Sequence, residues 1–373
     1  MTPEAPPESP RLLPAEHLQR LLDELLARGY TVIGPTVSQE AIVYDRITSV
    51  AALPRGWVDA QEPGKYRLEA KPDAGYFTHV VGPHSWKQYL FPPRAVLGTS
   101  DRTADGWTFQ AAEDDGVAYA FLGVRACELA AIDVQDRVFL QPRYIDPMYA
   151  ARRSRALFIA VNCTRAASTC FCVSMRTGPH CETGFDLALT ELPRGFVIET
   201  GSERGAEILA SLPTREVTEA DLRDAEERRQ LAVVQQTRSL PLDELHGLML
   251  SRLQHPRWDE VSERCLSCTN CTQVCPTCFC SSVRDVTDLD GEHVERERSW
   301  DSCFNFDFSY MNGGVVRNTV RARYRQWLTH KLGTWFDQFD ICGCVGCGRC
   351  VTWCPVGIDL TEEVAALRME APP

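Results

Sequence analysis

The chain has 373 residues, of which 44% are apolar, so it is long enough to bury a substantial core and to form two domains. Its formal net charge of -12 would repel a phosphate backbone, which argues against nucleic acid as the main partner. No run of about eighteen apolar residues occurs, so no membrane span is predicted.

The N-terminal segment, MTPEAPPESPRLLP, is acidic and rich in proline. It has neither the basic start nor the apolar segment of a secretory signal, so we expect a cytoplasmic protein. Its first dozen residues are predicted to be disordered, because they offer little apolar surface to bury.

Up to about residue 215, helical and strand patterns alternate. PAEHLQRLLDELLARG has the apolar spacing of a helix, whereas YTVIG, EAIVYD, VAYAFLGV and RALFIAVNC are short runs typical of strands. Pro and Gly separate these segments. We therefore predict an N-terminal mixed α/β domain within an α+β chain.

The stretch from about 215 to 253 is charged and favours helix, with a break expected at Pro241. It suits a helical connector between two domains. The predicted domains are residues 1–245, with the connector at their end, and residues 246–373, a mainly helical ferredoxin-like domain.

The second domain contains one cysteine motif twice, C-x2-C-x2-C-x3-C-P, as CLSCTNCTQVCP and CVGCGRCVTWCP. Three thiolates at this spacing come from one tight loop around a cubane iron-sulfur core, and the fourth must come from elsewhere. In two-cluster ferredoxins the last cysteine of each run binds the other run's cluster. Two [4Fe-4S] clusters are thus expected, one held by Cys265, Cys268, Cys271 and Cys354, the other by Cys344, Cys347, Cys350 and Cys275.

Zinc is the alternative metal, because C-x2-C pairs also hold zinc. Structural zinc uses two such pairs per ion and needs no third cysteine two residues further on, so the doubled motif favours iron-sulfur clusters. Cys275 and Cys344 are 69 positions apart, which favours a helical dicluster domain of an enzyme subunit over a small ferredoxin. The glycines of GCVGCGRC are expected to let the backbone pass close to a cluster.

Between the two runs, residues 315–331 (VVRNTVRARYRQWLTHK) carry apolar side chains at helical spacing together with several arginines. This pattern predicts an amphipathic helix with a basic face. A solvated surface is the ordinary explanation of such a face; docking of an acidic partner and balance of the clusters' negative charge are the alternatives. His293 and His330 are expected to be polar surface residues.

Nine further cysteines lie outside the two runs. Four of them, Cys127, Cys163, Cys170 and Cys172, are predicted at strand ends in the first domain, where they could hold a third cluster. The alternative is that they are buried as small apolar residues. Of the other five, Cys278, Cys280 and Cys303 could line the first cluster, replace a crossover ligand or pack in the core, and Cys181 and Cys342 are interpreted as spare.

Four segments, CLSCTNCTQVCPTCFC, SWDSCFNFDF, RNTVRARYRQWLTHK and CVGCGRCVTWCPVGIDL, together resemble the β subunit of cytoplasmic group 3 nickel-iron hydrogenases (sulfhydrogenases) and the similar iron-sulfur subunit of anaerobic sulfite reductase. The resemblance extends to VGPHSWKQYLFPP and FLGVRACELAAIDVQDRVFL, and covers about residues 40–365. It implies an electron-transfer subunit between a flavin subunit that handles NAD(P)H and a catalytic partner. That partner would be a nickel-iron hydrogenase, with its small and large subunits, or a sulfite reductase.

No G-x-G-x-x-G after a strand, P-loop or H-E-x-x-H motif occurs, so no catalytic site within the chain is predicted. The expected role is that of a non-catalytic subunit of an oxidoreductase complex. The alternatives from other classes are a structural or regulatory iron-sulfur protein and a zinc-stabilised interaction module.

Overall fold

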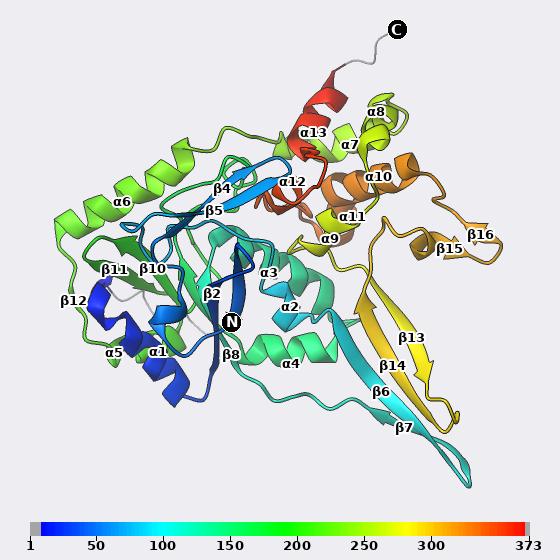
Figure 1. Cartoon of the computed structure of the whole chain (residues 1–373), viewed down its shortest axis with the longest axis horizontal. Helices are drawn as coiled ribbons and strands as arrows, with labels where there is room; N and C mark the ends of the chain where they lie inside the picture. The colour runs from blue at the N-terminus through cyan, green and yellow to red at the C-terminus, as the bar shows by residue number, and fades with distance from the viewer. Residues whose placement is uncertain (1–8, 370–373) are drawn as a thin grey trace.

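A mixed eight-stranded sheet forms the centre of the first part of the chain in this computed structural model, which describes residues 9–369 (Figure 1). Strands β10, β9, β8 and β2 are parallel to one another, and the outer strands add antiparallel. In spatial order the strands are β12 (Arg215–Glu216), β1 (Arg11–Pro14), β11 (Gly195–Thr200), β10 (Leu187–Leu192), β9 (Leu157–Val161), β8 (Tyr119–Val124), β2 (Thr31–Ser38) and β3 (Ala41–Arg46).

Helices cover both faces of this sheet, so its central strands are largely buried. All five residues of β9 are buried. Leu157 and Ile159 pack into one core with α1 (Leu18–Ala27) and α5 (Glu203–Ala210), whereas Phe158 packs into a second core with α3 (Ala126–Phe139) and α4 (Pro147–Arg155). The mixed α/β character predicted for this region is confirmed.

The remaining elements of the first part are short, apart from one long helix. They are the 3-10 turns Ala15–His17, Val50–Ala52 and Leu242–Glu244, the hairpin β4 (Trp57–Glu62) and β5 (Lys65–Ala70), α2 (Lys87–Leu90) and α6 (Glu219–Val234). The predicted connector helix ends at Val234 and not at Pro241. Residues 1–8 lie outside the described residues, and the predicted disorder is wrong for Leu12, which is buried in β1 opposite Val197.

The second part of the chain is built mainly of short helices around a core of its own. They are α7 (Leu245–Ser251), α8 (Arg257–Arg264), α9 (Asn270–Gln273), α10 (Val320–Thr329), α11 (Trp335–Phe339), α12 (Arg349–Thr352) and α13 (Leu360–Arg368). The basic helix predicted from residue 315 begins only at Val320, because the Thr319 hydroxyl caps it, and it continues as a π-helical turn over His330–Thr334. Within residues 9–369, no helix is both long and apolar enough to cross a membrane.

A four-stranded sheet joins the two parts and projects from the molecule (Figure 1). Its strands, in order, are β13 (Ser281–Thr287), β14 (His293–Trp300), β6 (Arg94–Thr103) and β7 (Gly106–Ala111), and the 3-10 turn Asp307–Ser309 with the small hairpin β15 (Tyr310–Met311) and β16 (Gly314–Val315) follows in the chain. Strand β14, from the segment between the cysteine runs, pairs with β6 of the first part. The pairing of β14 with β6 was not predicted, and it joins residues on either side of the domain boundary expected at residue 245. That boundary stays a prediction.

Candidate metal centre

The two cysteine runs fold in the same way. In the first run, Ser267 and Thr269 adopt left-handed conformations with φ of 51° and 68° before α9. In the second, Gly346 and Gly348 do so with φ of 64° and 76° before α12. Each left-handed residue and each helix lies 79 positions after its counterpart, so both runs present their first three thiols from the same loop and helical turn.

The glycines of the second run were expected to lie close to a cluster, but backbone atoms from the first part of the chain lie against them. A Cβ at Gly346 would lie 2.6 Å from the backbone nitrogen of Cys172, and one at Gly348 would lie 2.4 Å from the carbonyl oxygen of Thr169. The glycines therefore admit residues 169–172 of the first part against the run. Ser267 and Thr269 hold the equivalent positions in the first run, where a side chain is tolerated despite the unfavourable φ.

A small cavity collects three thiols of the first run and the last thiol of the second. Its lining includes Cys265, Cys268, Cys271 and Cys354, together with Cys350 of the second run. Burial raises the pKa of the Cys271 thiol well above its ordinary value, and the nearby thiols of Cys265, Cys354 and Cys268 raise it further. This is the grouping expected for the first cluster; which atoms bind iron stays a prediction.

The walls of this cavity fit an iron-sulfur cluster. Tyr324 and Trp327 line it, and their Oη and Nε1 atoms are buried without a hydrogen-bond partner in the described part of the chain. Buried donors of this kind nearly always find an acceptor. The sulfur atoms of a cluster are acceptors, and the aromatic walls, completed by Phe304, would keep water away from it.

The second run gathers with the last thiol of the first. Burial raises the pKa of the Cys350 thiol well above its ordinary value, and the thiols of Cys344, Cys275 and Cys347 add to this effect. Cys350 also borders the first cavity, so the two thiol groups are neighbours. The four cysteines predicted for the second cluster are thus brought together.

A buried lysine that the sequence had suggested as part of a solvated face lies beside Cys275. Lys331 is 2% exposed, and its Nζ donates to Cys275 Sγ at 3.3 Å, to Thr277 Oγ1 at 2.9 Å and to the Gly343 carbonyl at 2.8 Å. It forms no salt bridge with a carboxylate in the described part of the chain. The ammonium group therefore favours a negatively charged ligand at Cys275.

A second buried lysine, Lys87 of α2, lies on the other side of the same segment. Its Nζ donates to the carbonyl oxygens of Cys275 at 2.9 Å and Cys278 at 3.1 Å, and lies 3.8 Å from the ring centre of Trp300. Burial lowers the pKa of Lys87 to about 8, and the thiols of Cys278 and Cys275 oppose this shift. Nothing in the sequence pattern around Lys87 marks it as part of the site.

Three further cysteines lie around Cys275. The Cys278 thiol lies beside that of Cys275, and the Cys303 thiol lies beside that of Cys280. The Cys303 thiol lowers the pKa of Cys280 to about 7, and the Cys280 thiol in turn raises the pKa of Cys303. That one of these three cysteines replaces Cys275 or Cys354 as a crossover ligand stays a prediction. All three lie beside the second site.

The arginines of α10 do not form the free basic face that was predicted. Arg323 is buried and donates to the Arg317 carbonyl at 3.1 Å. Arg321 makes an ion pair with Asp259 of α8 at 2.7 Å, and Arg325 donates to the carbonyl oxygen of residue 253 at 2.7 Å. These side chains hold α10 against its neighbours.

The two histidines make local polar contacts. His293 pairs with Asp101 at 2.6 Å across β14 and β6, and the bond from Asp101 raises the pKa of His293. His330 is partly buried and bonds to Gln338 at 3.0 Å. Both histidines are half-buried, so the surface assignment is too simple for each of them.

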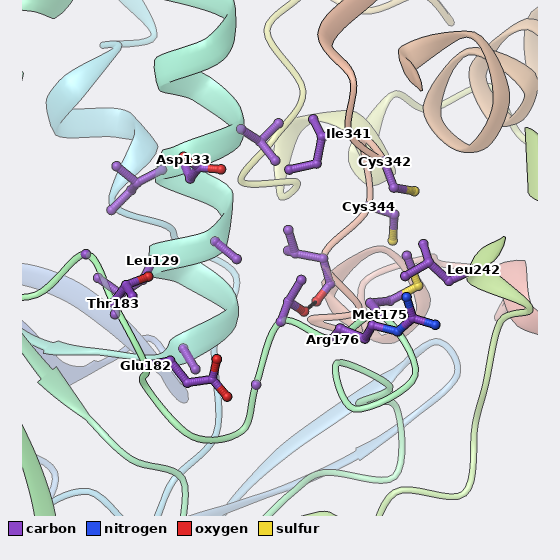
Figure 2. A pocket seen from close by; sticks show the side chains of 18 of the residues that line it. Leu129, Asp133, Met175, Arg176, Glu182, Thr183, Leu242, Ile341, Cys342 and Cys344 are labelled. Atoms are coloured by element: carbon purple, nitrogen blue, oxygen red, sulfur yellow. Dashed lines mark hydrogen bonds between the residues drawn. The ribbon is translucent and has the colours of Figure 1, made fainter. Parts of the chain in front are cut away.

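A cleft of about 1090 Å³ opens between α3 and residues 341–344 (Figure 2). Leu129 and Asp133 of α3 line one side, and Cys342 and Cys344 line the other. Cys342 is buried and belongs to the second core, whereas Cys344 belongs to the second thiol group. The cleft therefore gives the second site an opening to the surface.

The cysteines of the first domain lie closer together than their spacing suggests. Cys127 is in the first turn of α3, and Cys163 follows β9. Cys170 and Cys172 lie in the loop between β9 and β10, so the prediction that they lie at strand ends is wrong. Cys181 packs in the core under α3 and α4. Among residues 9–369, no group of three or more His, Cys, Asp or Glu side chains has the arrangement of a site for a single metal ion.

Comparison with known proteins gives two matches. Residues 264–358 match the 4Fe-4S dicluster domain. The chain is 34% identical over 253 residues to the protein named sulfhydrogenase 2 subunit beta of Pyrococcus furiosus, a match that covers 67% of this chain and 74% of the relative. No solved structure matches.

Proposed function

Because the chain belongs to the sulfhydrogenase β-subunit family, we propose that it carries electrons between a flavin subunit that handles NAD(P)H and the catalytic subunits of a nickel-iron hydrogenase. It is an iron-sulfur electron-transfer subunit. The observation that carries the proposal is the crossed grouping, in which the last thiol of each run joins the first three of the other.

Two [4Fe-4S] clusters would accept and release one electron each. Cys265, Cys268, Cys271 and Cys354 are the proposed ligands of the first, and Cys344, Cys347, Cys350 and Cys275 of the second. The chain contributes the enclosure and the charge around these thiols. Cys350 borders both sites, which supports a short path between them.

The surface near the first site supports contact with a partner. Cys268 is exposed, and beside it Leu266 is 63% exposed. An apolar residue at the rim of an electron-transfer site suits a docking surface. The similarity to a sulfhydrogenase subunit favours sulfhydrogenase partners over a sulfite reductase, and a cytoplasmic location is part of the same proposal.

Anaerobic purification tests this function. The protein is expected to hold at least about eight irons and to be reduced reversibly by dithionite. Cys268→Ala should lower the iron content or give a three-iron cluster, with a changed EPR spectrum, and Cys354→Ser should disturb the same signal. An unchanged spectrum in both variants would disprove the ligand sets, and clusters that dithionite does not reduce reversibly would disprove electron transfer.

A further inference from the structure

We propose that Cys127, Cys163, Cys170 and Cys172 hold a third iron-sulfur cluster, which extends the electron path from the second site into the first domain. The inference rests on the proposed function for its chemistry, but it concerns other residues. Cys127, Cys170 and Cys172 pack with Cys347 of the second run in one group of buried side chains. Three of the four thiols are less than 10% exposed.

The loop that carries Cys170 and Cys172 meets the start of α3. A Cβ at Gly178 would lie 3.3 Å from Cys172 Sγ and 3.5 Å from the backbone nitrogen of Cys127. Cys172 Sγ therefore lies beside the first turn of a 14-residue helix, whose positive end favours a thiolate. Burial raises the pKa of both Cys170 and Cys172, and Cys163, just after β9, is close enough to add to this effect.

The same loop is fixed directly to the second run. The Phe171 N–H donates to the Gly346 carbonyl at 2.9 Å, and Thr177 Oγ1 donates to the Val345 carbonyl at 2.7 Å. The missing side chains of Gly346 and Gly348 make this contact possible. These hydrogen bonds to the backbone of the second run thus hold the candidate site against the second site, as a path for electrons requires.

A buried cation faces this group of thiols. Arg125 is 1% exposed; its Nη2 donates to the carbonyl oxygens of Phe77 and His79, both at 2.8 Å, and its Nη1 lies 4.0 Å from Cys163 Sγ. Its guanidinium bonds to no carboxylate among the described residues. Burying such a charge is costly unless negative groups balance it. The buried carboxylates of Glu128 and Glu191 offset part of it, and a thiolate-bound cluster beside Cys163 would offset it further. Lys331 and Cys275 form the same arrangement at the second site.

Donors without partners surround the same thiols. Arg349 Nη1 and Trp335 Nε1 are buried and have no hydrogen-bond partner in the described part of the chain. Trp335 packs with Cys127, Cys170 and Cys172. Burial opposes the charge of Arg349, but its partner Glu128 raises its pKa, and the thiols of Cys347 and Cys127 add smaller effects in the same direction. Gln236 Nε2 donates to Cys172 Sγ at 3.4 Å. Thiols buried only as small apolar residues would leave these donors unexplained, whereas cluster sulfurs would accept from them.

Iron counting on the full-length protein tests the proposal. After anaerobic reconstitution with iron and sulfide, the wild type should hold about twelve irons per chain, three cubanes of four. Cys172→Ser and Cys127→Ser should each remove about four irons or leave a three-iron cluster, while the EPR signals that depend on Cys268 and Cys354 persist. Cys181→Ala, a change of an equally buried cysteine in the same domain, is the control and should retain all the iron.

Each alternative result overturns the third cluster. A wild-type protein that holds only about eight irons, or that binds zinc in place of the additional iron, would disprove the third cluster. This measurement does not depend on the folding of any variant. Loss of the same iron in Cys181→Ala disproves the ligand set. Failure of the electron-transfer proposal has a different readout. In that case the EPR signals that depend on Cys268 and Cys354 are not reduced and reoxidised reversibly with dithionite.

Discussion

At the scale of single residues, the site is shaped by positive charges in places that exclude water. Lys331 is held by a sulfur atom, a hydroxyl and a carbonyl oxygen, so its ammonium group cannot turn away from Cys275. Reduction of a cluster adds a negative charge, and a fixed ammonium group nearby stabilises the reduced form. Lys331 should therefore raise the reduction potential of the proposed second cluster.

Lys331→Met should lower that potential while the iron content stays the same. A change of about 1.4 kcal/mol corresponds to about 60 mV for a one-electron couple, and a shift of this order is expected. A redox titration followed by EPR measures it.

Lys65→Met is the control for Lys331→Met, since Lys65 is 64% exposed and pairs with Glu62 at the surface. It should leave the potential unchanged. An unchanged potential in Lys331→Met with full iron would show that the lysine acts only in packing.

At the scale of elements, the end of β14 connects the projecting sheet to the second thiol group. Trp300 Nε1 donates to the Phe91 carbonyl at 2.9 Å, its backbone N–H donates to Pro93 at 2.8 Å, and Lys87 lies over its ring. A strand end thus supports a buried cation that bonds to the backbone around Cys275.

Trp300→Ala should lower the free energy of unfolding by about 2–4 kcal/mol, because it removes packing and a cation–π contact together. Trp107→Ala changes a tryptophan of the same sheet that is 55% exposed, and it should have an effect of less than about 0.5 kcal/mol. Chemical denaturation of both variants provides the comparison. Equal effects would mean that β14 is no more important to stability than the free edge at β7.

The sequence predicts those elements that local patterns determine. The apolar runs of β2, β3, β8 and β9 and the helical spacing of α1 identify elements that the structure contains. The spacing within the two runs also identifies the thiols that come together. The pairing of β14 with β6 has no local signal, because both strands are largely polar and their contact joins residues about 200 positions apart.

The same limit applies within the candidate site. Lys331 follows four arginines in a segment whose composition suggests a solvated face, and only the π-helical turn at His330–Thr334 and the packing around it show that Lys331 is buried. Gly346 and Gly348 were expected to let the backbone pass close to a cluster, but the group that approaches them, residues 169–172, comes from a distant part of the chain.

At the scale of the whole molecule, the two parts of the chain depend on the clusters to different degrees. The large sheet has two apolar cores of its own, whereas α9 and α12 are single turns between cysteines. For such segments, the free energy of metal binding becomes free energy of folding. The loop at residues 169–177 belongs with them, since it bonds to the second run.

Removal of iron with a chelator should therefore act unevenly. Amide hydrogen exchange is expected to increase in α9, α12 and residues 169–177, while β8 and β9 keep their protection. Mass spectrometry of the protein before and after chelation measures this difference. A uniform increase along the chain would mean that the molecule unfolds as one unit.

The crossed grouping of the cysteines also has a consequence for biosynthesis. Cys265, Cys268 and Cys271 leave the ribosome first, yet under the proposed ligand sets their site lacks a ligand until Cys354 has been made. The second site needs Cys350, which is translated only four codons earlier. Both sites would thus become complete almost together, after β13, β14 and α10 have been synthesised, so the machinery that inserts clusters would meet a chain already long enough to fold around them.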